Sequence, residues 1–283
     1  MERELIYDRG NMKIYREGDR AVKVIPARSY RYLRKAARLQ AFARDAGLPV
    51  PAVHGIRRVG MKKTELAMDY VDGRPFPCDE AATQEMAKIH AKIGKIDGSG
   101  LPAFAEHIER EIKKSPHLAG PVKKDVLSLI GRLDTGKTNL CHGDMHMGNL
   151  LFDGERYWII DWSPGSVSRG DPAADACNTY LYQRRFVPDC AEVYLNTFCN
   201  ASGIAQETVL AWLPVMAGFQ VNIKDDEERA YILAIIESEC PGESRKHTHQ
   251  VTAKQSSALR EFGPRPGDSP KDLAFSWPRA MSP

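Results

Sequence analysis

The chain has 283 residues, of which 42% are hydrophobic and 27% are charged, with a formal net charge of +3. This length fits one large domain or two modest ones, and the apolar fraction suffices for a packed core, which excludes a largely disordered or a collagen-like chain. The first residues lack a basic segment followed by an apolar run, and no apolar stretch approaches the ~20 residues that span a bilayer, so we expect neither a secretory signal nor a membrane anchor.

Short β-type runs fill the first 70 residues. Strands are predicted at residues 5–7, 12–15, 21–25, 53–59 and 65–70, where apolar residues cluster or alternate. Gly10-Asn11 is typical of a tight turn between the first two strands. Apolar residues at three- and four-residue spacing predict a helix over residues 29–46, with Ser29 as its N-cap. The pattern β-β-β-α-β-β indicates a small antiparallel sheet with one helix.

Helical periodicity dominates after residue 70. Helices are predicted at residues 79–96, 105–114, 122–133, 189–200 and 227–238, with short strands at 140–141, 150–152 and 158–160. From residue 241 the chain is rich in Pro, Gly, Ser and basic residues without periodicity, which is typical of disorder. We therefore expect an α+β protein of two lobes: an N-terminal lobe at 1–70, a larger, mainly helical lobe at 71–239, and a disordered tail at 240–283.

Charge and cysteine content add to this division. Residues 1–63 hold 16 Lys/Arg against 6 Asp/Glu, a net +10, whereas residues 64–239 hold 17 against 27, a net −10. Two interpretations stay open: the first lobe attracts phosphate and the second a cationic ligand, or both are ordinary solvated surfaces. The six cysteines are scattered without a CxxC pair, which indicates reduced thiols and a cytoplasmic protein, and argues against zinc.

The densest polar cluster is His142-Gly143-Asp144, followed by Asn149 and, at the end of an apolar run, by Asp161. Each residue alone could cap a turn or end a strand. Together, the pattern HGDxxxxN and a second Asp twelve residues further on supply the hard oxygen donors that Mg²⁺ prefers at a phosphoryl-transfer site. The remaining Asp can accept the proton of an attacking hydroxyl.

This pattern, with Ile160-Asp161-Trp162, strongly resembles the aminoglycoside phosphotransferase/choline kinase family, whose fold is similar to that of protein kinases. The likeness covers most of residues 1–239. It implies that Asp144 is the catalytic base, that His142 braces the loop, and that Asn149 and Asp161 bind Mg²⁺.

The resemblance also assigns a nucleotide site in the first lobe. Val22-Lys23-Val24 is similar to the strand whose lysine holds the α- and β-phosphates, and Gly10 and Asn11 lie where the family has its phosphate-covering turn. Backbone groups of Asp69 and Val71 would bind adenine. The cofactors implied are ATP (or GTP) and Mg²⁺.

The implied activity is transfer of the γ-phosphoryl group to a hydroxyl of a small molecule, such as an aminoglycoside or amino alcohol. No nucleic-acid or membrane partner is expected, and the oligomeric state is not encoded in any motif. One departure favours an alternative. The family has a Glu in its small-lobe helix that pairs with the lysine, but residues 29–46 contain none. Glu65 is a substitute by its position in the sheet, and a pseudokinase or regulatory nucleotide-binding module is the second interpretation.

Residues 131–138 match the P-loop pattern GxxxxGK[ST], which offers a third interpretation, a P-loop NTPase. That loop needs a strand before it and a helix after it, so that helix N-terminal amides meet the phosphate. Here a helical run precedes the pattern and a strand follows it, which favours a helix C-terminus and turn. Among the remaining histidines, we expect His90 to pack against the catalytic loop and His146 to lie near the substrate.

Overall fold

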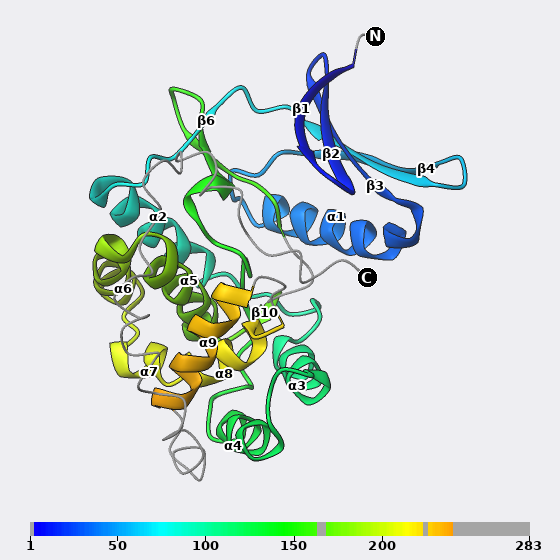
Figure 1. Ribbon diagram of the computed structural model, residues 1–283. Coiled ribbons are helices and arrows are strands. Elements are labelled where there is room, and N and C mark those ends of the chain that lie inside the picture. Colours follow the sequence, from blue (N-terminus) through cyan, green and yellow to red (C-terminus); the bar gives the residue numbers. More distant parts are fainter. Residues whose placement is uncertain (1–2, 163–167, 223–225, 240–283) are drawn as a thin grey trace. The chain divides into compact units, whose positions relative to one another are not determined.

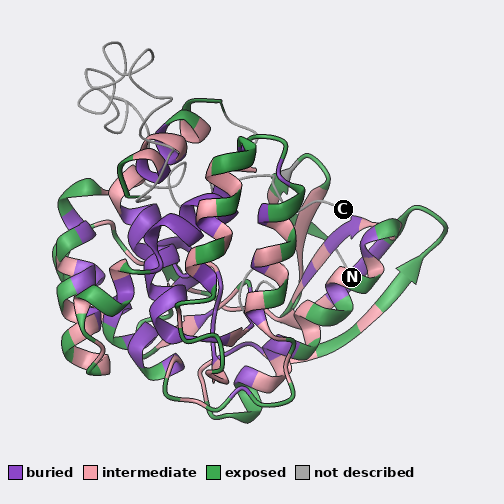
Figure 2. Cartoon of the chain, turned by 90° about the horizontal axis from the view of Figure 1, so that it is seen from below, coloured by how far each residue is buried: buried purple, intermediate pink, exposed green. Residues whose placement is uncertain are grey.

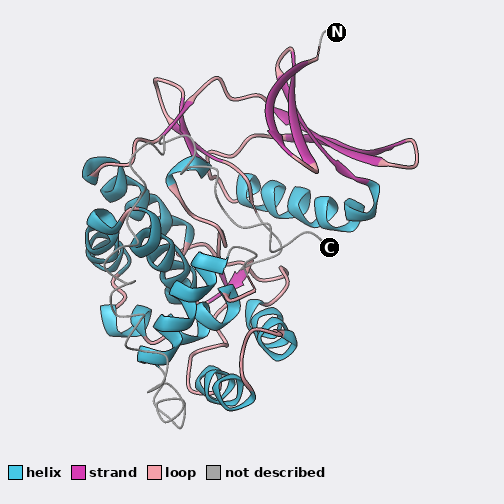
Figure 3. Ribbon diagram, viewed as in Figure 1, coloured by secondary structure: helices cyan, strands magenta, loops and turns pink. Residues whose placement is uncertain are grey.

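The computed structural model describes residues 3–162, 168–222 and 226–239, and its contacts divide the chain into two compact units (Figure 1). Over the described residues, unit 1 comprises 3–76 and 148–162, and unit 2 comprises 77–147 and 168–239 without 223–225. Strands dominate unit 1 and helices dominate unit 2 (Figure 3). The chain therefore has an α+β architecture of two parts.

Unit 1 is built on a five-stranded antiparallel sheet with the order β1-β2-β3-β5-β4. Its strands are β1 (Glu4–Arg9), β2 (Met12–Glu17), β3 (Arg20–Pro26), β4 (Val53–Val59) and β5 (Lys63–Asp69). A 3₁₀ turn (Ala27–Ser29) leads into α1 (Tyr30–Asp45), which packs on one sheet face through a cluster around Ile25, Leu33 and Leu66. Leu33, Leu39 and Ala43 of α1 are buried, and the half-buried Tyr32 and Ala37 pack on the same cluster, so the apolar face of the helix meets the sheet.

A second, three-stranded sheet completes unit 1, in the order β6 (Arg74–Pro75), β8 (Leu150–Phe152) and β9 (Tyr157–Ile159). The Ile159 amide of this sheet donates to the carbonyl of Pro49, in the segment between α1 and β4, at 2.8 Å. The grouping differs from the expected division at residue 70. Residues 71–76 and 148–162 both belong to unit 1. Arg74 and Pro75 pair with Phe152 and Leu151, which joins the two segments to each other, and the Ile159–Pro49 bond joins them to the segment before β4.

Unit 2 is mainly helical, with a two-stranded sheet of β7 (Asn139–Leu140) and β10 (Arg169–Gly170). Its helices are α2 (Glu80–Ile93), α3 (Phe104–Lys114), α4 (Gly120–Ile130), α5 (Pro172–Phe186), α6 (Pro188–Ser202), α7 (Gln206–Leu210), α8 (Leu213–Gln220) and α9 (Asp226–Glu239). Buried residues gather in the middle of these helices (Figure 2). Residues 172–183 of α5 are all buried, so this helix forms the centre of the unit.

Most expected elements match observed ones, with differences at the ends. Ser29 makes no side-chain capping bond, because the 3₁₀ turn precedes α1. α2 and α5 begin instead at true caps: the carboxylates of Asp79 and Asp171 accept from the Ala82 and Ala173 amides at 2.8 and 3.0 Å. The expected disordered tail at 240–283 lies outside the described residues. Across the described ranges, no helix is both long and apolar enough to cross a membrane.

Candidate active site

The loop that carries the HGD motif follows β7 in unit 2 and is largely buried. His142 is fully buried, and its Nδ1 accepts the Asp144 amide at 3.3 Å, which closes a tight turn around Gly143, a residue with φ +82°. The left-handed backbone at this position favours glycine. The turn leaves the Asp144 side chain 12% exposed. A carboxylate held in this way has a fixed origin and limited contact with solvent.

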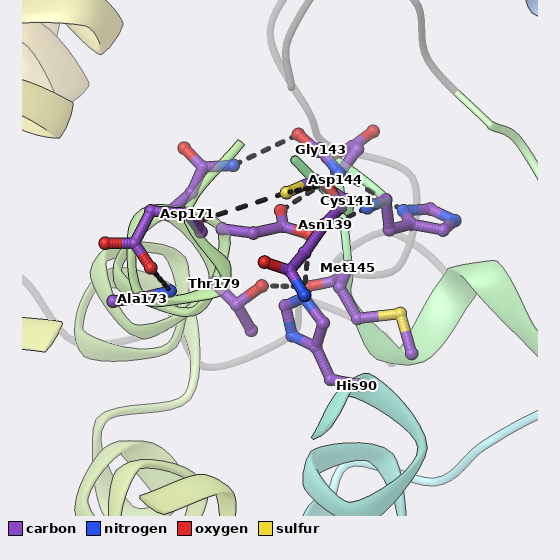
Figure 4. A network of polar contacts seen from close by, with 12 residues as sticks. His90, Asn139, Cys141, Gly143, Asp144, Met145, Asp171, Ala173 and Thr179 are labelled. Atoms are coloured by element: carbon purple, nitrogen blue, oxygen red, sulfur yellow. Dashed lines mark hydrogen bonds and ion pairs between the residues drawn. The ribbon is translucent and has the colours of Figure 1, made fainter. Parts of the chain in front are cut away.

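Side chains of helix α5 bind the backbone of the same loop. The Asn178 side-chain amide donates to the Gly143 carbonyl at 3.1 Å, and the Thr179 hydroxyl donates to the Met145 carbonyl at 3.0 Å. Figure 4 shows Thr179 directed toward Met145 from this helix. These buried side chains satisfy carbonyls that would otherwise be costly to bury. Neither residue was singled out from the sequence, because both lie in the middle of α5, where no local pattern marks them.

Asp175 is the central acceptor of this arrangement. Its carboxylate accepts the His142 amide at 2.7 Å and the Gly143 amide at 3.0 Å. It also contacts His90 Nε2 at 2.9 Å, and His90 Nδ1 lies 2.7 Å from the Tyr194 hydroxyl. His90 therefore reaches the loop through Asp175.

The charge state of Asp175 follows from these contacts. Burial alone would raise the pKa of its carboxyl, but the neighbouring His90 and His142, together with the His142 amide, outweigh burial and lower the pKa. The group is therefore an ionised, fully satisfied buried carboxylate. Such a group fixes the two residues before Asp144 in place.

His146 lies beside the motif aspartate. Its ring is 5% exposed and stacks on Tyr182 of α5, with centroids 5.3 Å apart and planes 23° apart. His146 Nε2 is 4.0 Å from Asp144 Oδ2. This places an imidazole within ion-pair range of the carboxylate.

In unit 1, Lys23 and Asp161 form an ion pair. Lys23 lies in β3, and its Nζ is 2.7 Å from Asp161 Oδ1; the two side chains are 14% and 43% exposed. Burial lowers the pKa of Lys23, but the Asp161 carboxylate, together with Tyr32 and Tyr7, more than offsets this, so the pKa is raised overall and the amine stays charged. The pair brings together two of the residues predicted from the sequence.

Asp161 has an unusual backbone. Its φ of +55° is the only left-handed value among the non-glycine residues that the structure describes. Aspartate tolerates this region better than most residues, yet it still costs about 1 kcal/mol, and such strain gathers at functional sites. Asn149 lies at the same end of the β8–β9 pair, because the Ile160 amide donates to the Asn149 carbonyl at 3.0 Å.

These residues fit a magnesium ion by the chemistry of their donors. Asp161 supplies a carboxylate and Asn149 an amide oxygen, both at the open end of one hairpin, and Mg²⁺ takes one or two such oxygens and completes its shell with water and phosphate. The ammonium group of Lys23, 2.7 Å from Asp161 Oδ1, stabilises the negative charge of that carboxylate. The donor set is of the hard type that Mg²⁺ requires.

Glu65 does not partner Lys23. In the β3–β5 ladder Lys23 pairs with Leu66 and Val24 with Glu65, so the two side chains leave opposite faces of the sheet. The Glu65 carboxylate instead meets Arg3 at 3.0 Å and Arg57 at 2.7 Å. Side chains alternate between the two faces of a sheet, so this pairing is excluded once the register of β3 and β5 is known; the sequence alone does not give that register.

The other predicted nucleotide contacts are backbone groups of unit 1. Gly10 and Asn11 form the two-residue turn of the β1–β2 hairpin, with Gly10 at φ +59°. The Asp69 amide donates to the Ala52 carbonyl at 2.9 Å, so only its carbonyl could meet a base. Within the described ranges, the Val71 amide has no backbone partner.

The P-loop-like segment is structural. α4 precedes it and β7 follows it, which is the reverse of the order that a phosphate cradle needs. Lys137 Nζ lies 3.1 Å from the carboxylate of Asp171, which also accepts from the Trp212 indole at 3.2 Å. Lys137 thus neutralises the buried N-cap of α5.

A sheet unit with a strand lysine paired to an aspartate, and a helical unit with a braced HGD loop, define the class of small-molecule kinases. The model of the phosphotransferase enzyme family APH matches residues 8–212. The chain therefore belongs to this phosphotransferase family, and it is an enzyme of the kinase type. A comparison with curated protein sequences gives no match.

Solved structures share the fold at low sequence identity. A protein assigned as a fructosamine-3-kinase from Haemophilus somnus 129PT is similar with a TM-score of 0.63 and 12% identity, over 84% of this chain and 90% of that one. A mutant of aminoglycoside phosphotransferase APH(4)-Ia, in a complex with ADP and hygromycin B, gives 0.62 and 15%, over 85% and 95%. The choline kinase LicA of Streptococcus pneumoniae gives 0.55 and 14%, over 93% and 94%.

Proposed function

We propose that this enzyme transfers the γ-phosphoryl group of ATP, with Mg²⁺, to a hydroxyl group of a small cationic molecule such as an aminoglycoside or an amino alcohol. The observation that carries the proposal is the Asp144 carboxylate on a loop that α5 braces at nearly every residue. Phosphoryl transfer depends on positioning and electrostatics more than on covalent chemistry, and a rigid carboxylate is what it needs from a base.

Unit 1 would hold the nucleotide. Lys23 would contact the phosphates, the Gly10-Asn11 turn would cover them, and the Asp69 carbonyl and Val71 amide would meet the base. Asn149 and Asp161 would hold Mg²⁺, which neutralises charge on the phosphates when bound. Because Asp161 is also the counter-ion of Lys23, nucleotide binding would replace this pair by contacts of each residue with the phosphates and the metal.

Unit 2 would supply the base and the acceptor. Asp144 would orient the acceptor hydroxyl and take its proton as the oxygen attacks the γ-phosphorus. His142 and the α5 side chains would keep the carboxylate in place. The net −10 of residues 64–239 supports an acceptor that carries ammonium groups.

The missing helix glutamate does not leave Lys23 unheld, since Asp161 contacts it at 2.7 Å. This contact keeps an acid beside the lysine before nucleotide binds, which supports an active kinase over a pseudokinase. We place the reaction in the cytoplasm, which supplies ATP. In support of this, the five cysteines of the described residues are all free.

An acceptor panel tests the proposal. ADP release from ATP and Mg²⁺ is measured with aminoglycosides, amino alcohols and neutral sugars, for the wild type and for Asp144→Asn. The expected result is acceptor-dependent ADP release with at least one amine-bearing alcohol, abolished by the substitution. ADP release that no acceptor stimulates, or that survives Asp144→Asn, would contradict the proposal.

A further inference from the structure

Four side chains on one face of α5 contact the HGD loop in register. Residues 175, 178, 179 and 182 follow the helical spacing i, i+3, i+4 and i+7, so they share a face. The first three hold the backbone of residues 142–145 by hydrogen bonds. The fourth, Tyr182, contacts a side chain instead, the imidazole of His146.

The Tyr182 contact fixes the plane of that imidazole. The two rings are nearly parallel, 23° apart, and Tyr182 in turn packs on Phe186 at 4.8 Å between centroids. His146 is 5% exposed, so its ring has little room to rotate. A stacked pair of buried rings is a stable platform, stronger than area burial alone would give.

The platform presents one ring nitrogen to the motif aspartate. His146 Nε2 lies 4.0 Å from Asp144 Oδ2, and the two side chains are 6% and 12% exposed. In a site that excludes most water, attraction between an imidazole N–H and a carboxylate is stronger than in solvent. Contacts of this kind are commonly long without substrate and tighten in the reacting complex.

We propose that His146 is a positioning residue for the carboxylate of Asp144, and that Tyr182 holds it in that role. The inference rests on the proposed function of Asp144 as the base. The imidazole biases the carboxylate toward one rotamer, so that the acceptor hydroxyl meets an oriented base. Its loss acts on the chemical step and leaves the binding of nucleotide and acceptor nearly unchanged.

The kinetic test uses two pairs of variants. His146→Leu removes the ring nitrogen, whereas His146→Gln keeps an N–H donor; Tyr182→Leu removes the stack, whereas Tyr182→Phe keeps it. The leucine variants are expected to lower kcat by about 10- to 100-fold, because small misplacements of a reacting group cost up to ~100-fold. Both KM values should change by less than about twofold, and the Gln and Phe variants should recover most of the loss.

The control is His117→Leu, which makes the same change at an exposed position of unit 2 and should leave kcat unaltered. A rise in acceptor KM without a fall in kcat would overturn the inference, since it would make His146 a substrate contact. Equal losses in the Gln and Leu variants would also overturn it. If either leucine variant fails to fold, the imidazole ¹⁵N resonances of His146 in the wild type and in Asp144→Asn decide the same point.

A second readout is independent of turnover. The imidazole ¹⁵N resonances of His146, assigned by their loss in His146→Gln, should shift in Asp144→Asn and not in the surface variant Asp189→Asn. Unshifted resonances would overturn the inference even if the enzyme is a kinase. If Asp144→Asn keeps full activity while the resonances shift, the contact stands and the proposed base fails.

Discussion

The two units hold their functional charges in opposite ways. In unit 1, Lys23 and Asp161 form an ion pair, with Asp161 43% exposed and its backbone strained at φ +55°. In unit 2, Asp175 is 1% exposed and accepts two backbone amides beside His90, all within hydrogen-bond distance. The first arrangement is easy to exchange, and the second is not.

This difference follows the steps of the proposed reaction. Lys23 and Asp161 would exchange each other for phosphate and metal in every cycle, so a pair with a partly exposed carboxylate suits them. The base must stay where it is, so a network that fixes its loop suits it, because preorganised groups need no rearrangement at the moment of reaction. The following predictions test this contrast, in order of decreasing effect.

Asp144→Asn is expected to lower kcat by about 10²- to 10⁴-fold, the range that a general base contributes. Because the substitution keeps the size of the side chain and the backbone bonds of the loop, the unfolding midpoint should stay within error of the wild type. Steady-state ADP release and thermal unfolding measure the two effects. Asp189→Asn, an exposed carboxylate in α6, is the matched control. A variant that loses activity by unfolding would contradict the role of Asp144.

Asp175→Asn is expected to lower the free energy of unfolding by about 3 kcal/mol, since it breaks a buried charged network. The pH dependence has a defined sign. The pKa of Asp175 is lowered in the fold, so its stabilisation is complete above the ordinary Asp pKa of about 3.9 and is lost as pH falls through the folded value.

Urea unfolding of wild type and Asp175→Asn at several pH values measures that sign. The difference in unfolding free energy should be constant above about pH 4 and shrink below it. A difference that grows toward acid pH would mean that Asp175 is protonated in the native protein.

Lys23→Met is expected to lower kcat/KM for ATP by about 100-fold, as the loss of one preorganised charge contact does. Lys137→Met is the matched control. It removes the ion pair between Lys137, which is partly exposed, and the buried Asp171. The loss should cost only ~1 kcal/mol of stability, and nucleotide affinity should not change. Titration with ATP and Mg²⁺ separates the two lysines, and the reverse pattern would support a P-loop.

Glu65→Gln tests the smallest expected effect. The pKa of Glu65 is lowered, because Arg3 and Arg57 outweigh the burial that would raise it. The substitution removes the ion pairs of this buried carboxylate with two more exposed arginines, and it should cost ~1 kcal/mol of stability. Nucleotide affinity should match the wild type, because the Lys23 side chain leaves the other sheet face. Weaker ATP binding in this variant would restore Glu65 as the lysine's partner.

The sequence predicted the parts of the site that depend on short patterns. HGDxxxxN, Asp161 and Lys23 each lie within a short, continuous piece of sequence, and local spacing predicts the strands and turns around them. It did not predict what depends on long-range register. The Lys23–Asp161 pair spans 138 residues, and the Asp175–His90 contact spans 85.

Burial explains another omission. Asp175, Asn178 and Thr179 look like ordinary polar residues of a helix, and only the burial of residues 172–183 shows that each needs a partner inside the protein. The boundary at residue 70 differs for a similar reason. Residues 148–162 join unit 1 through backbone bonds, the β6–β8 pairing and the bond from the Ile159 amide to the Pro49 carbonyl, which side-chain patterns do not encode.

Transfer of a labelled γ-phosphoryl group tests the central claim most directly. The enzyme is incubated with γ-labelled ATP, Mg²⁺ and the acceptor that most stimulates ADP release, and the products are separated by mass spectrometry. We predict that the label is found on an acceptor hydroxyl with the wild type and with Lys137→Met, and is absent with Asp144→Asn. Label found only in inorganic phosphate, or transfer that persists in Asp144→Asn, would contradict the account.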